Sequence, residues 1–280
     1  MESQVQPAAL SLPQLLQRHD RDRFLASLYA PARHRPALWA LLGFSYEIAR
    51  VREIVTQPIM GQIRLQWWRD AIDEIYTGKP ARRHEVAEPL AEAIRRHGLA
   101  RAPLDAMIDA RERDLLAEHP PATLADLESF LADTSSALLQ AEIAVLAGVD
   151  GGPAARRIGI AWGLTGLIRA LPFHAAAGRS YIPDDIAGAA GLAERDAPSP
   201  SLAAAVQRLG AAARGHLSAA RDLRRELPAR ALPALLIARL ARRYLDLLDL
   251  AGGDPYAPAL QRPDPLAAWR LGWGRLIGRY

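Results

Sequence analysis

The chain has 280 residues, of which 50% are hydrophobic and 24% are charged, a composition typical of a globular protein with a sizeable core. It has no cysteine, which excludes disulfides, thiol nucleophiles and cysteine-ligated metal centres. The net charge of +4 favours anionic partners. Because basic and acidic residues are interspersed along the whole chain, we expect no nucleic-acid partner.

The hydropathy of the chain bears on its location and its division into segments. No run of eighteen apolar residues appears, and the first residues lack a basic region followed by an apolar one. We therefore expect no membrane span, no secretory signal and a cytoplasmic location, with peripheral attachment to the inner membrane left open. We expect a flexible segment over 1–19, one helical domain over 20–250, and a proline-rich linker with an amphipathic tail over 251–280.

Helical periodicity dominates the first half of the chain. It predicts helices at 20–29, 36–54, 58–76, 86–97 and 103–118, three of which begin with a suitably placed proline. In the third of these helices, apolar residues at three- and four-residue spacing predict a buried stripe with Trp67 at its rim. The stripe consists of Leu65, Trp68, Ile72 and Ile75.

The second half begins with a capping signal, since Thr123 is followed three residues later by Asp126 at the start of a helix over 123–147. The next helix crosses Pro172 and ends before Gly178. Its small residues weaken the helix unless they let a neighbour come close; they are Gly159, Ala161, Gly163 and Gly166. A loop over 184–201 and helices over 202–226 and 229–250 follow.

The tail is a separate amphipathic segment. Its large apolar residues share one helical face, with Arg275 and Arg279 turned away; they are Trp269, Trp273, Leu276, Ile277 and Tyr280. We favour docking of this face onto the domain, and contact with a membrane or a partner is the alternative.

Several segments resemble the motifs of the squalene/phytoene synthase family. The family's second signature, A-x-Q-L-T-N-I-x-R-D-x-x-x-D followed by G-R-x-Y-[IL]-P, is matched at Ala161, Leu164, Thr165, Arg169, Gly178, Arg179, Tyr181 and Pro183. Matches to earlier motifs include Phe24, Arg35, Phe44, Arg64, Trp68, Arg69, Tyr76, Asp126 and Leu127. The resemblance implies an all-α, isoprenoid-synthase-type helical bundle around a central cavity.

The chain departs from the family where the family does its chemistry. Ala170 and His174 stand in place of two aspartates, and Ala49 and Glu53 stand at the ends of the first acidic motif. Phe130 replaces a tyrosine. Magnesium is held by carboxylates, whereas alanine offers no ligand and imidazole is a poor one for this cation. We therefore predict no catalytic residue, no metal and no other cofactor, and interpret His174 as a satisfied or surface histidine.

Basic residues near these positions suggest a different kind of site. We predict that Arg50, Arg52, Arg169 and Arg179, with Tyr181, form the basic rim of a site for a prenyl or lipid phosphate, because arginine pairs with phosphate oxygens without a metal. The competing interpretation is that these arginines pair only with local carboxylates.

Two segments, DRFLASLYAPARHRPALWALL and QIRLQWWRDAIDEIYTG, are similar to a subgroup of the family with degenerate aspartate motifs. This subgroup includes the respiratory complex I assembly factor. The similarity implies a non-catalytic role in ligand binding or in complex I assembly, with a membrane-associated assembly partner. The alternative is an active prenyltransferase that condenses prenyl diphosphates at an altered site containing magnesium.

Overall fold

A computed structural model describes residues 11–195 and 197–280. They form helices joined by short connections, with no strand among the described residues. The α-helices are α1 Leu12–His19, α2 Arg21–Ser27, α3 Arg35–Ala49, α4 Val51–Ile54, α5 Pro58–Tyr76, α6 Ala87–His97, α7 Ala102–Leu116, α8 Leu124–Leu131, α9 Ala137–Ala147, α10 Gly152–Ala176, α11 Asp184–Ala190, α12 Pro200–Asp222, α13 Leu232–Leu235, α14 Ile237–Leu250, α15 Pro258–Gln261 and α16 Ala267–Leu276. Three 3₁₀ turns are η1 Ala32–His34, η3 Arg224–Glu226 and η4 Ala229–Ala231, and η2 Ala132–Ser136 is a π-helical turn.

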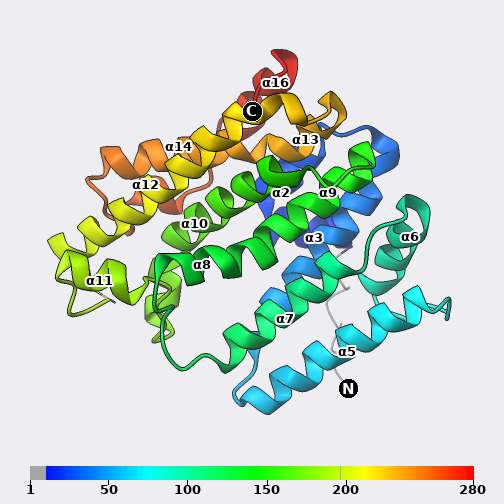
Figure 1. The fold of residues 1–280 in the computed structure, drawn as a ribbon, viewed down its shortest axis with the longest axis horizontal. Coiled ribbons are helices and arrows are strands. Elements are labelled where there is room, and N and C mark those ends of the chain that lie inside the picture. The colour runs from blue at the N-terminus through cyan, green and yellow to red at the C-terminus, as the bar shows by residue number, and fades with distance from the viewer. Residues whose placement is uncertain (1–10, 196) are drawn as a thin grey trace, which may run out of the picture.

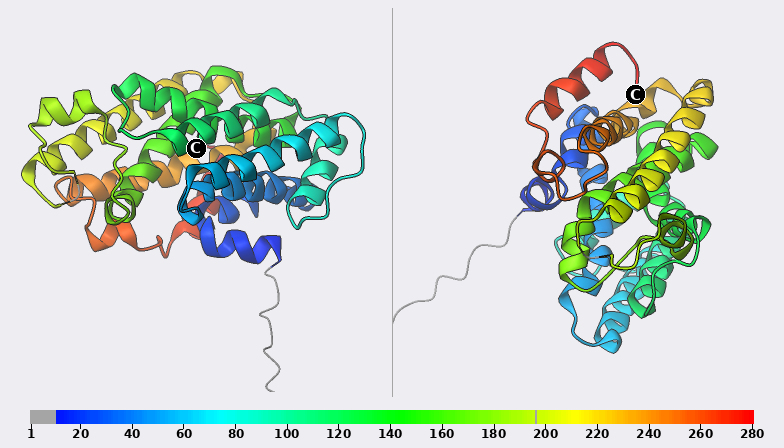
Figure 2. Two further views of the ribbon diagram at one scale, coloured as in Figure 1. Left: turned by 90° about the horizontal axis from the view of Figure 1, so that it is seen from below. Right: turned by 90° about the vertical axis from the view of Figure 1, so that its left-hand side faces the viewer.

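Helix α10 lies at the centre of the bundle (Figure 1). It packs against α12 and α14 on one side and against α8, η2 and α9 on the other. Helix α3 packs against α6 and α9, and α5 lies along α7. The bundle is elongated, with α11 at one end and the α5–α6 connection at the other (Figure 2). This arrangement confirms the all-α helical bundle expected from the sequence.

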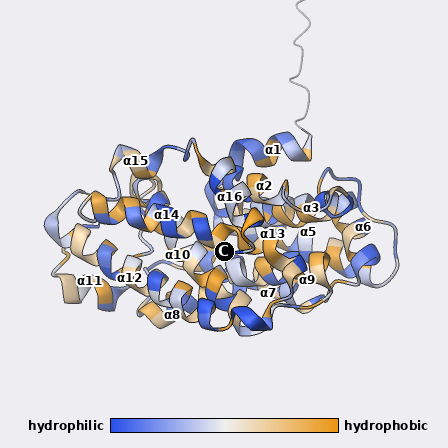
Figure 3. Ribbon diagram, turned by 90° about the horizontal axis from the view of Figure 1, so that it is seen from above, coloured by the Kyte–Doolittle hydropathy of each residue, from blue (hydrophilic) through white to orange (hydrophobic). Residues whose placement is uncertain are grey.

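Outer helices show the two-sided pattern that burial of one face requires. Hydrophilic and hydrophobic residues alternate along α14 (Figure 3). On that helix Leu240 and Leu248 are fully buried in the core, whereas Asp246 and Asp249 are exposed. Most of the stability of such a helix comes from packing of its apolar face.

The structure confirms most of the helix boundaries expected from local sequence signals. Thr123 caps α8, because its Oγ1 accepts a hydrogen bond from Asp126 N at 3.2 Å and the Asp126 carboxylate accepts from Thr123 N at 3.0 Å. The predicted stripe on α5 is buried, and Trp67 is only partly buried at its edge. The helix expected over 36–54 is divided at Arg50 into α3 and α4.

Two segment predictions are wrong. Residues 12–19, expected within a flexible segment, form α1, which packs against α3 through buried Leu15 and Leu16. Residues 1–10 of that predicted segment lie outside the described residues. The loop expected over 184–201 contains helix α11, which packs against α12 and buries Ala187.

The segment from α8 to α9 is the most apolar helical stretch in the described part of the chain. Leu124–Ala147 is long and apolar enough to cross a membrane by length and composition, which the search for an unbroken apolar run did not predict. In the structure 67% of its most apolar window is buried, against α7, α10 and α3. A core helix meets the same criteria, so this segment is explained by burial within the bundle.

The tail docks onto the bundle, but its helix does so through the face opposite to the predicted one; of the predicted face, Tyr280 packs against the core and donates to Ala220 O at 3.2 Å. Ala267, Leu271 and Gly274 are buried against α2 and α14, while Trp269 and Trp273 are 65% and 48% exposed. Small residues favour this choice, because a Cβ added at Gly274 would lie 2.8 Å from Arg239 Nε, so a larger residue there would require the Arg239 side chain to shift.

Small residues on α10 allow the close helix contact that the sequence predicts. A Cβ added at Gly159 would lie 2.7 Å from Ser136 N in η2, closer than real Cβ atoms come. A Cβ added at Gly166, on the same helix, would meet nothing within 4 Å. Gly159 is therefore required for the contact of α10 with η2, whereas Gly166 is not.

Gly159→Ala is expected to lower the free energy of unfolding by roughly 1–3 kcal/mol, because the added methyl group forces the backbones of α10 and η2 apart. Gly166→Ala is the matched control and should be neutral or stabilising by up to ~1 kcal/mol, because alanine favours helix more than glycine does. Urea denaturation of both variants measures the difference. Equal stabilities would contradict the close contact.

Candidate functional site

A cavity of about 270 Å³ lies in the middle of the bundle. Its walls come from α3 and α4, α7, α8 with η2, and the middle and end of α10. We call it the central cavity. The π-helical turn η2 contributes Thr134 and Ser135 to the wall. Such turns widen a helix locally and are frequent at functional sites.

The central cavity brings together the five positions that the motif resemblance assigns to altered catalytic residues. They are Ala49, Glu53, Phe130, Ala170 and His174. These residues come from α3, α4, α8 and α10, which are far apart in the sequence. The motif resemblance therefore identified the walls of one cavity.

The structure brings only part of the predicted basic rim together. Arg52, Arg179 and Tyr181 line the central cavity. Arg50 does not: its guanidinium pairs with Glu47 at 3.2 Å and lies 5.3 Å from the centre of the Tyr46 ring. Arg50 and Arg52 are two residues apart in a helical region, so they point to different sides, and only Arg52 faces the cavity.

Arg169 is also outside the central cavity, in a buried network on the other side of α10. Its guanidinium pairs with Asp22 at 3.2 Å, and it stacks over the Tyr244 ring at 3.7 Å. Tyr244 donates a hydrogen bond to the same Asp22 carboxylate at 2.8 Å. Arg169 therefore joins α10 to α2 and α14 and does not line the central cavity.

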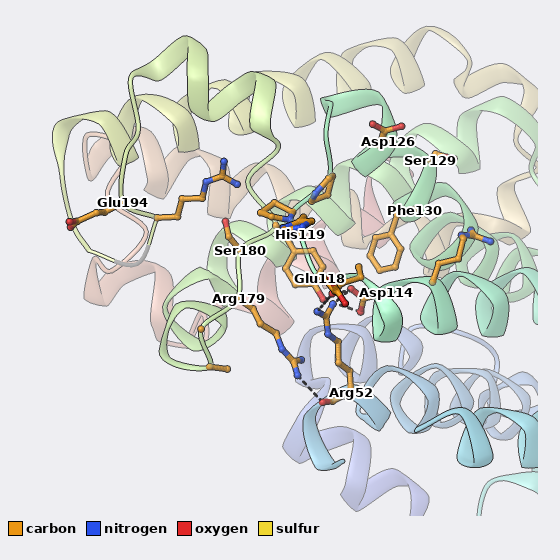
Figure 4. Close-up of a pocket in the computed structure, with 18 of the residues that line it drawn as sticks. Arg52, Asp114, Glu118, His119, Asp126, Ser129, Phe130, Arg179, Ser180 and Glu194 are labelled. Carbon is orange, nitrogen blue, oxygen red and sulfur yellow. Dashed lines mark hydrogen bonds and ion pairs between the residues drawn. The ribbon is translucent and has the colours of Figure 1, made fainter. Parts of the chain in front are cut away.

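Asp114 of α7 is the acidic centre of the site. It pairs with Arg52, and it accepts a hydrogen bond from the Tyr181 hydroxyl at 2.8 Å. Arg52 also donates to Ala117 O at 3.0 Å, and Arg179 donates to Arg52 O at 3.1 Å (Figure 4). These contacts tie α4, α7 and the segment after α10 together, so the mouth of the cavity is held by polar contacts.

Burial and charge shift the ionisation of the aromatic residues at this centre. Burial is the main cause that lowers the pKa of His174 to about 4; Asp114 opposes the shift, and Arg179, Arg52 and Arg111 add to it, so its imidazole is neutral at pH 7. Its ring lies 4.8 Å from that of Tyr181. Burial, and then Asp114, raise the pKa of Tyr181 well above its usual value, so the phenol stays protonated and donates to Asp114. His174 is thus a half-buried neutral group and not a surface histidine.

A larger pocket of about 980 Å³ lies directly outside this centre. We call it the outer pocket. Five residues line both it and the central cavity, namely Arg52, Asp114, Phe130, Arg179 and Tyr181. The outer pocket is bounded further by residues 117–121 and by Glu194 and Arg195 (Figure 4). The two spaces therefore share a wall of polar and aromatic side chains.

Sequence reasoning missed three charged residues of the central cavity, Arg23, Arg111 and Asp114. The sequence does contain a signal for one of these residues, Arg111. Arg111 lies three residues after Ile108 and four before Leu115, both buried, so a charged residue interrupts the buried stripe of α7. Burial lowers the pKa of the Arg111 guanidinium, which lies 5.2 Å from the centre of the Phe130 ring.

The described residues offer few ligand atoms for a metal ion. Among residues 11–195 and 197–280, no three His, Asp or Glu side chains gather closely enough to hold a metal ion. The central cavity has two carboxylates, Glu53 and Asp114, against the four guanidiniums of Arg23, Arg52, Arg111 and Arg179.

The sequence profile of squalene/phytoene synthase matches residues 16–274. The chain belongs to this family. Among solved structures, a dehydrosqualene synthase in complex with ligand superposes with a TM-score of 0.81, at 16% identity, over 95% of this chain and 94% of that one. A squalene synthase from Alicyclobacillus acidocaldarius gives a TM-score of 0.76, at 17% identity, over 88% of this chain and 94% of that one.

Curated relatives of this family member include proteins of two different names. NADH dehydrogenase (ubiquinone) complex I, assembly factor 6, from Bos taurus is 31% identical over 93% of this chain and 80% of the relative. The Homo sapiens protein of the same name is 29% identical over 90% of this chain and 77% of the relative. A presqualene diphosphate synthase from Rhodopseudomonas palustris is 27% identical over 81% of this chain and 82% of the relative.

Proposed function

We propose that this squalene/phytoene synthase family member is a non-catalytic factor that holds a prenyl or lipid phosphate in its central cavity and acts in the assembly of respiratory complex I. The observation that carries the ligand proposal is the charge of the cavity lining, four arginines against two carboxylates. Arginine binds phosphate oxygens bidentately, so this lining favours a phosphate group.

The same lining supports the proposal that no magnesium or other cofactor takes part. Of the two carboxylates, Asp114 is already engaged by Arg52 and Tyr181. Magnesium needs several free oxygen ligands in near-octahedral geometry, and four guanidiniums repel it. This set of donors does not fit the cation.

The assembly role rests on the relatives named complex I assembly factor 6, which match most of this chain. We propose a membrane-associated assembly partner, and a cytoplasmic location against the inner membrane. Comparison of assembled complex I on native gels, in cells with and without the gene, tests this role, and unchanged complex I would contradict it.

The second candidate function is prenyl transfer. It is favoured by the presqualene diphosphate synthase relative and by Glu53, whose carboxylate remains in the cavity wall. Against it, departure of diphosphate needs charge stabilisation that increases in the transition state, and arginines fixed by Asp114 and by backbone oxygens need not supply it.

A titration with farnesyl diphosphate in the presence of magnesium separates the two functions. We expect the purified chain to bind the compound and to release no pyrophosphate. Release at about one turnover per second, typical of enzymes, would establish the prenyltransferase alternative. The absence of any binding would contradict the ligand-holding function.

The matched variants of this titration are Arg179→Gln and Arg50→Gln, which remove the same charge. Arg179 lines the cavity, so its loss should weaken binding about tenfold, the usual effect of one charged hydrogen bond. Arg50 lies outside, so its variant should bind like the wild type. Equal affinities of both variants would place the bound phosphate elsewhere.

A further inference from the structure

A second charged pocket, of about 540 Å³, lies between α14, the end of α12 and the tail, and it shares no lining residue with the central cavity. Seven of its lining residues are arginines and one, Asp246, is acidic. Three arginines come from α14, two from the end of α12 and η3, and two from the tail; they are Arg239, Arg242, Arg243, Arg221, Arg224, Arg270 and Arg279. We call it the arginine pocket.

The charge of this pocket is largely uncompensated within the chain. Arg270 pairs with Asp264 at 2.9 Å, while Asp246 pairs with Arg214, outside the pocket, at 3.1 Å. The other six arginines of the pocket form no ion pair in the part of the chain that the structure describes. Like charges held together at a protein surface are unfavourable unless a counter-charge is bound.

The pKa values of two guanidiniums in the pocket are consistent with an uncompensated positive charge. Burial lowers the pKa of Arg242, and Arg221 lowers it further. Burial and then Arg270 lower the pKa of Arg239. Both shifts mean that the folded protein disfavours the charged forms of these groups, so an anion placed among them would be stabilised.

Two donors in the pocket are also unused. The Nε atoms of Arg239 and Arg243 are buried and have no hydrogen-bond partner among the described residues. A buried donor without a partner costs about 1–3 kcal/mol, and more when it is charged. The arrangement is otherwise fixed, because Arg224 donates to Gly278 O and Arg239 donates to Arg279 O at 3.4 Å. The tail backbone thus holds two arginines in place around unsatisfied donors.

We propose that the arginine pocket binds a phosphate-bearing anion. Guanidiniums converge on it from three segments, which suits a compact group with several oxygens, and each can pair with phosphate in a bidentate manner. The bound phosphate supplies the missing counter-charge.

Two sources of such a phosphate are distinguishable, a soluble phosphate ester and the headgroup of an anionic lipid. The outward face of α16 beside the pocket makes the lipid source worth testing. Trp269 and Trp273 stack with their ring centres 6.1 Å apart, and Leu276 is 76% exposed. Ile277 belongs both to this exposed apolar set and to the pocket lining. Tryptophan and leucine next to basic groups are typical of surfaces that lie against lipid.

The test compares Arg242→Gln/Arg243→Gln with Arg156→Gln/Arg157→Gln. The second pair removes the same charge from exposed positions on α10, outside the pocket. All proteins carry Arg179→Gln, so that the central cavity contributes little. The probes are inorganic pyrophosphate, by calorimetry, and vesicles of phosphatidylcholine with phosphatidylglycerol, by co-sedimentation.

We expect at least one probe to bind the control, and the α14 variant to bind it about tenfold more weakly for each arginine removed. Binding of pyrophosphate identifies a soluble ligand. Binding of vesicles alone, weakened further by Trp269→Ser/Trp273→Ser, identifies a lipid headgroup. Failure of both probes, or equal binding by the two variants, overturns the proposal. If the α14 variant does not fold by circular dichroism, Arg221→Gln/Arg279→Gln, at two exposed positions of the pocket, decides the result in its place.

Discussion

Asp114→Ala is expected to lower the free energy of unfolding by about 3–5 kcal/mol, the usual cost of removing one partner from a buried ion pair. The Asp114 and Arg52 side chains are 8% and 17% exposed, so the pair is largely shielded from water. Removal of the carboxylate leaves Arg52 without its counter-ion and the Tyr181 hydroxyl without its acceptor. It also removes the acidic group that favours the charged form of Arg111.

Urea denaturation measures this loss, and Asp109→Ala is the control. Asp109 lies on the same helix and pairs with Arg69 at 2.7 Å, but its side chain is 52% exposed. An exposed pair contributes at most ~1 kcal/mol, so the control should be close to the wild type. If both variants lost the same stability, the charged centre between α4, α7 and the end of α10 would not be a buried network.

The second large effect is a dependence of stability on pH that comes from Glu142. This carboxyl is buried on α9, next to a very small cavity that Arg23 also lines. Burial raises its pKa to about 8; Arg23 opposes the shift and Asp20 adds to it. In the unfolded chain the ordinary value is 4.5, so unfolding releases a proton between these two values. The folded state therefore loses stability as pH rises from about 4.5 to 8, by up to ~1.4 kcal/mol per pH unit.

Glu142→Gln keeps the shape of the neutral carboxyl and cannot ionise, so this variant should lack the decline. The free energy of unfolding, measured by urea denaturation at several pH values between about 5 and 9, gives the two slopes. The exposed substitution Glu92→Gln should keep the slope of the wild type. A Glu142→Gln variant with the same slope as the wild type would mean that Glu142 is ionised in the folded protein.

Local signals explain which parts of the fold can be predicted from the sequence. The cap at Thr123 and the buried stripe of α5 depend on residues three or four positions apart, so the sequence contains all that determines them. The tail differs. Its tryptophan-rich face predicts inward packing, but docking depends on how closely Gly274 approaches Arg239, 35 positions earlier in the chain. No periodicity within the tail contains that information.

The candidate site shows the same difference between features set by local sequence and features set by long-range contacts. Motif spacing located the walls of the central cavity through Ala49, Ala170 and His174. It did not separate Arg50 from Arg52, which lie two residues apart and therefore face different sides of the helical region. It also missed Asp114, whose partners Arg52 and Tyr181 lie 62 and 67 positions away. Long-range pairs of this kind appear only once the helices are placed.

The order of the helices along the chain has a consequence for biosynthesis. The apolar stretch from α8 to α9 is covered by α3 and α7, which are made earlier, and by α10, which is made later. Until Ala176 has left the ribosome, one flank of this stretch has no partner, although it already has the length and hydropathy of a segment that membrane-insertion machinery accepts. The apolar stretch therefore keeps one side uncovered until the central helix has been added.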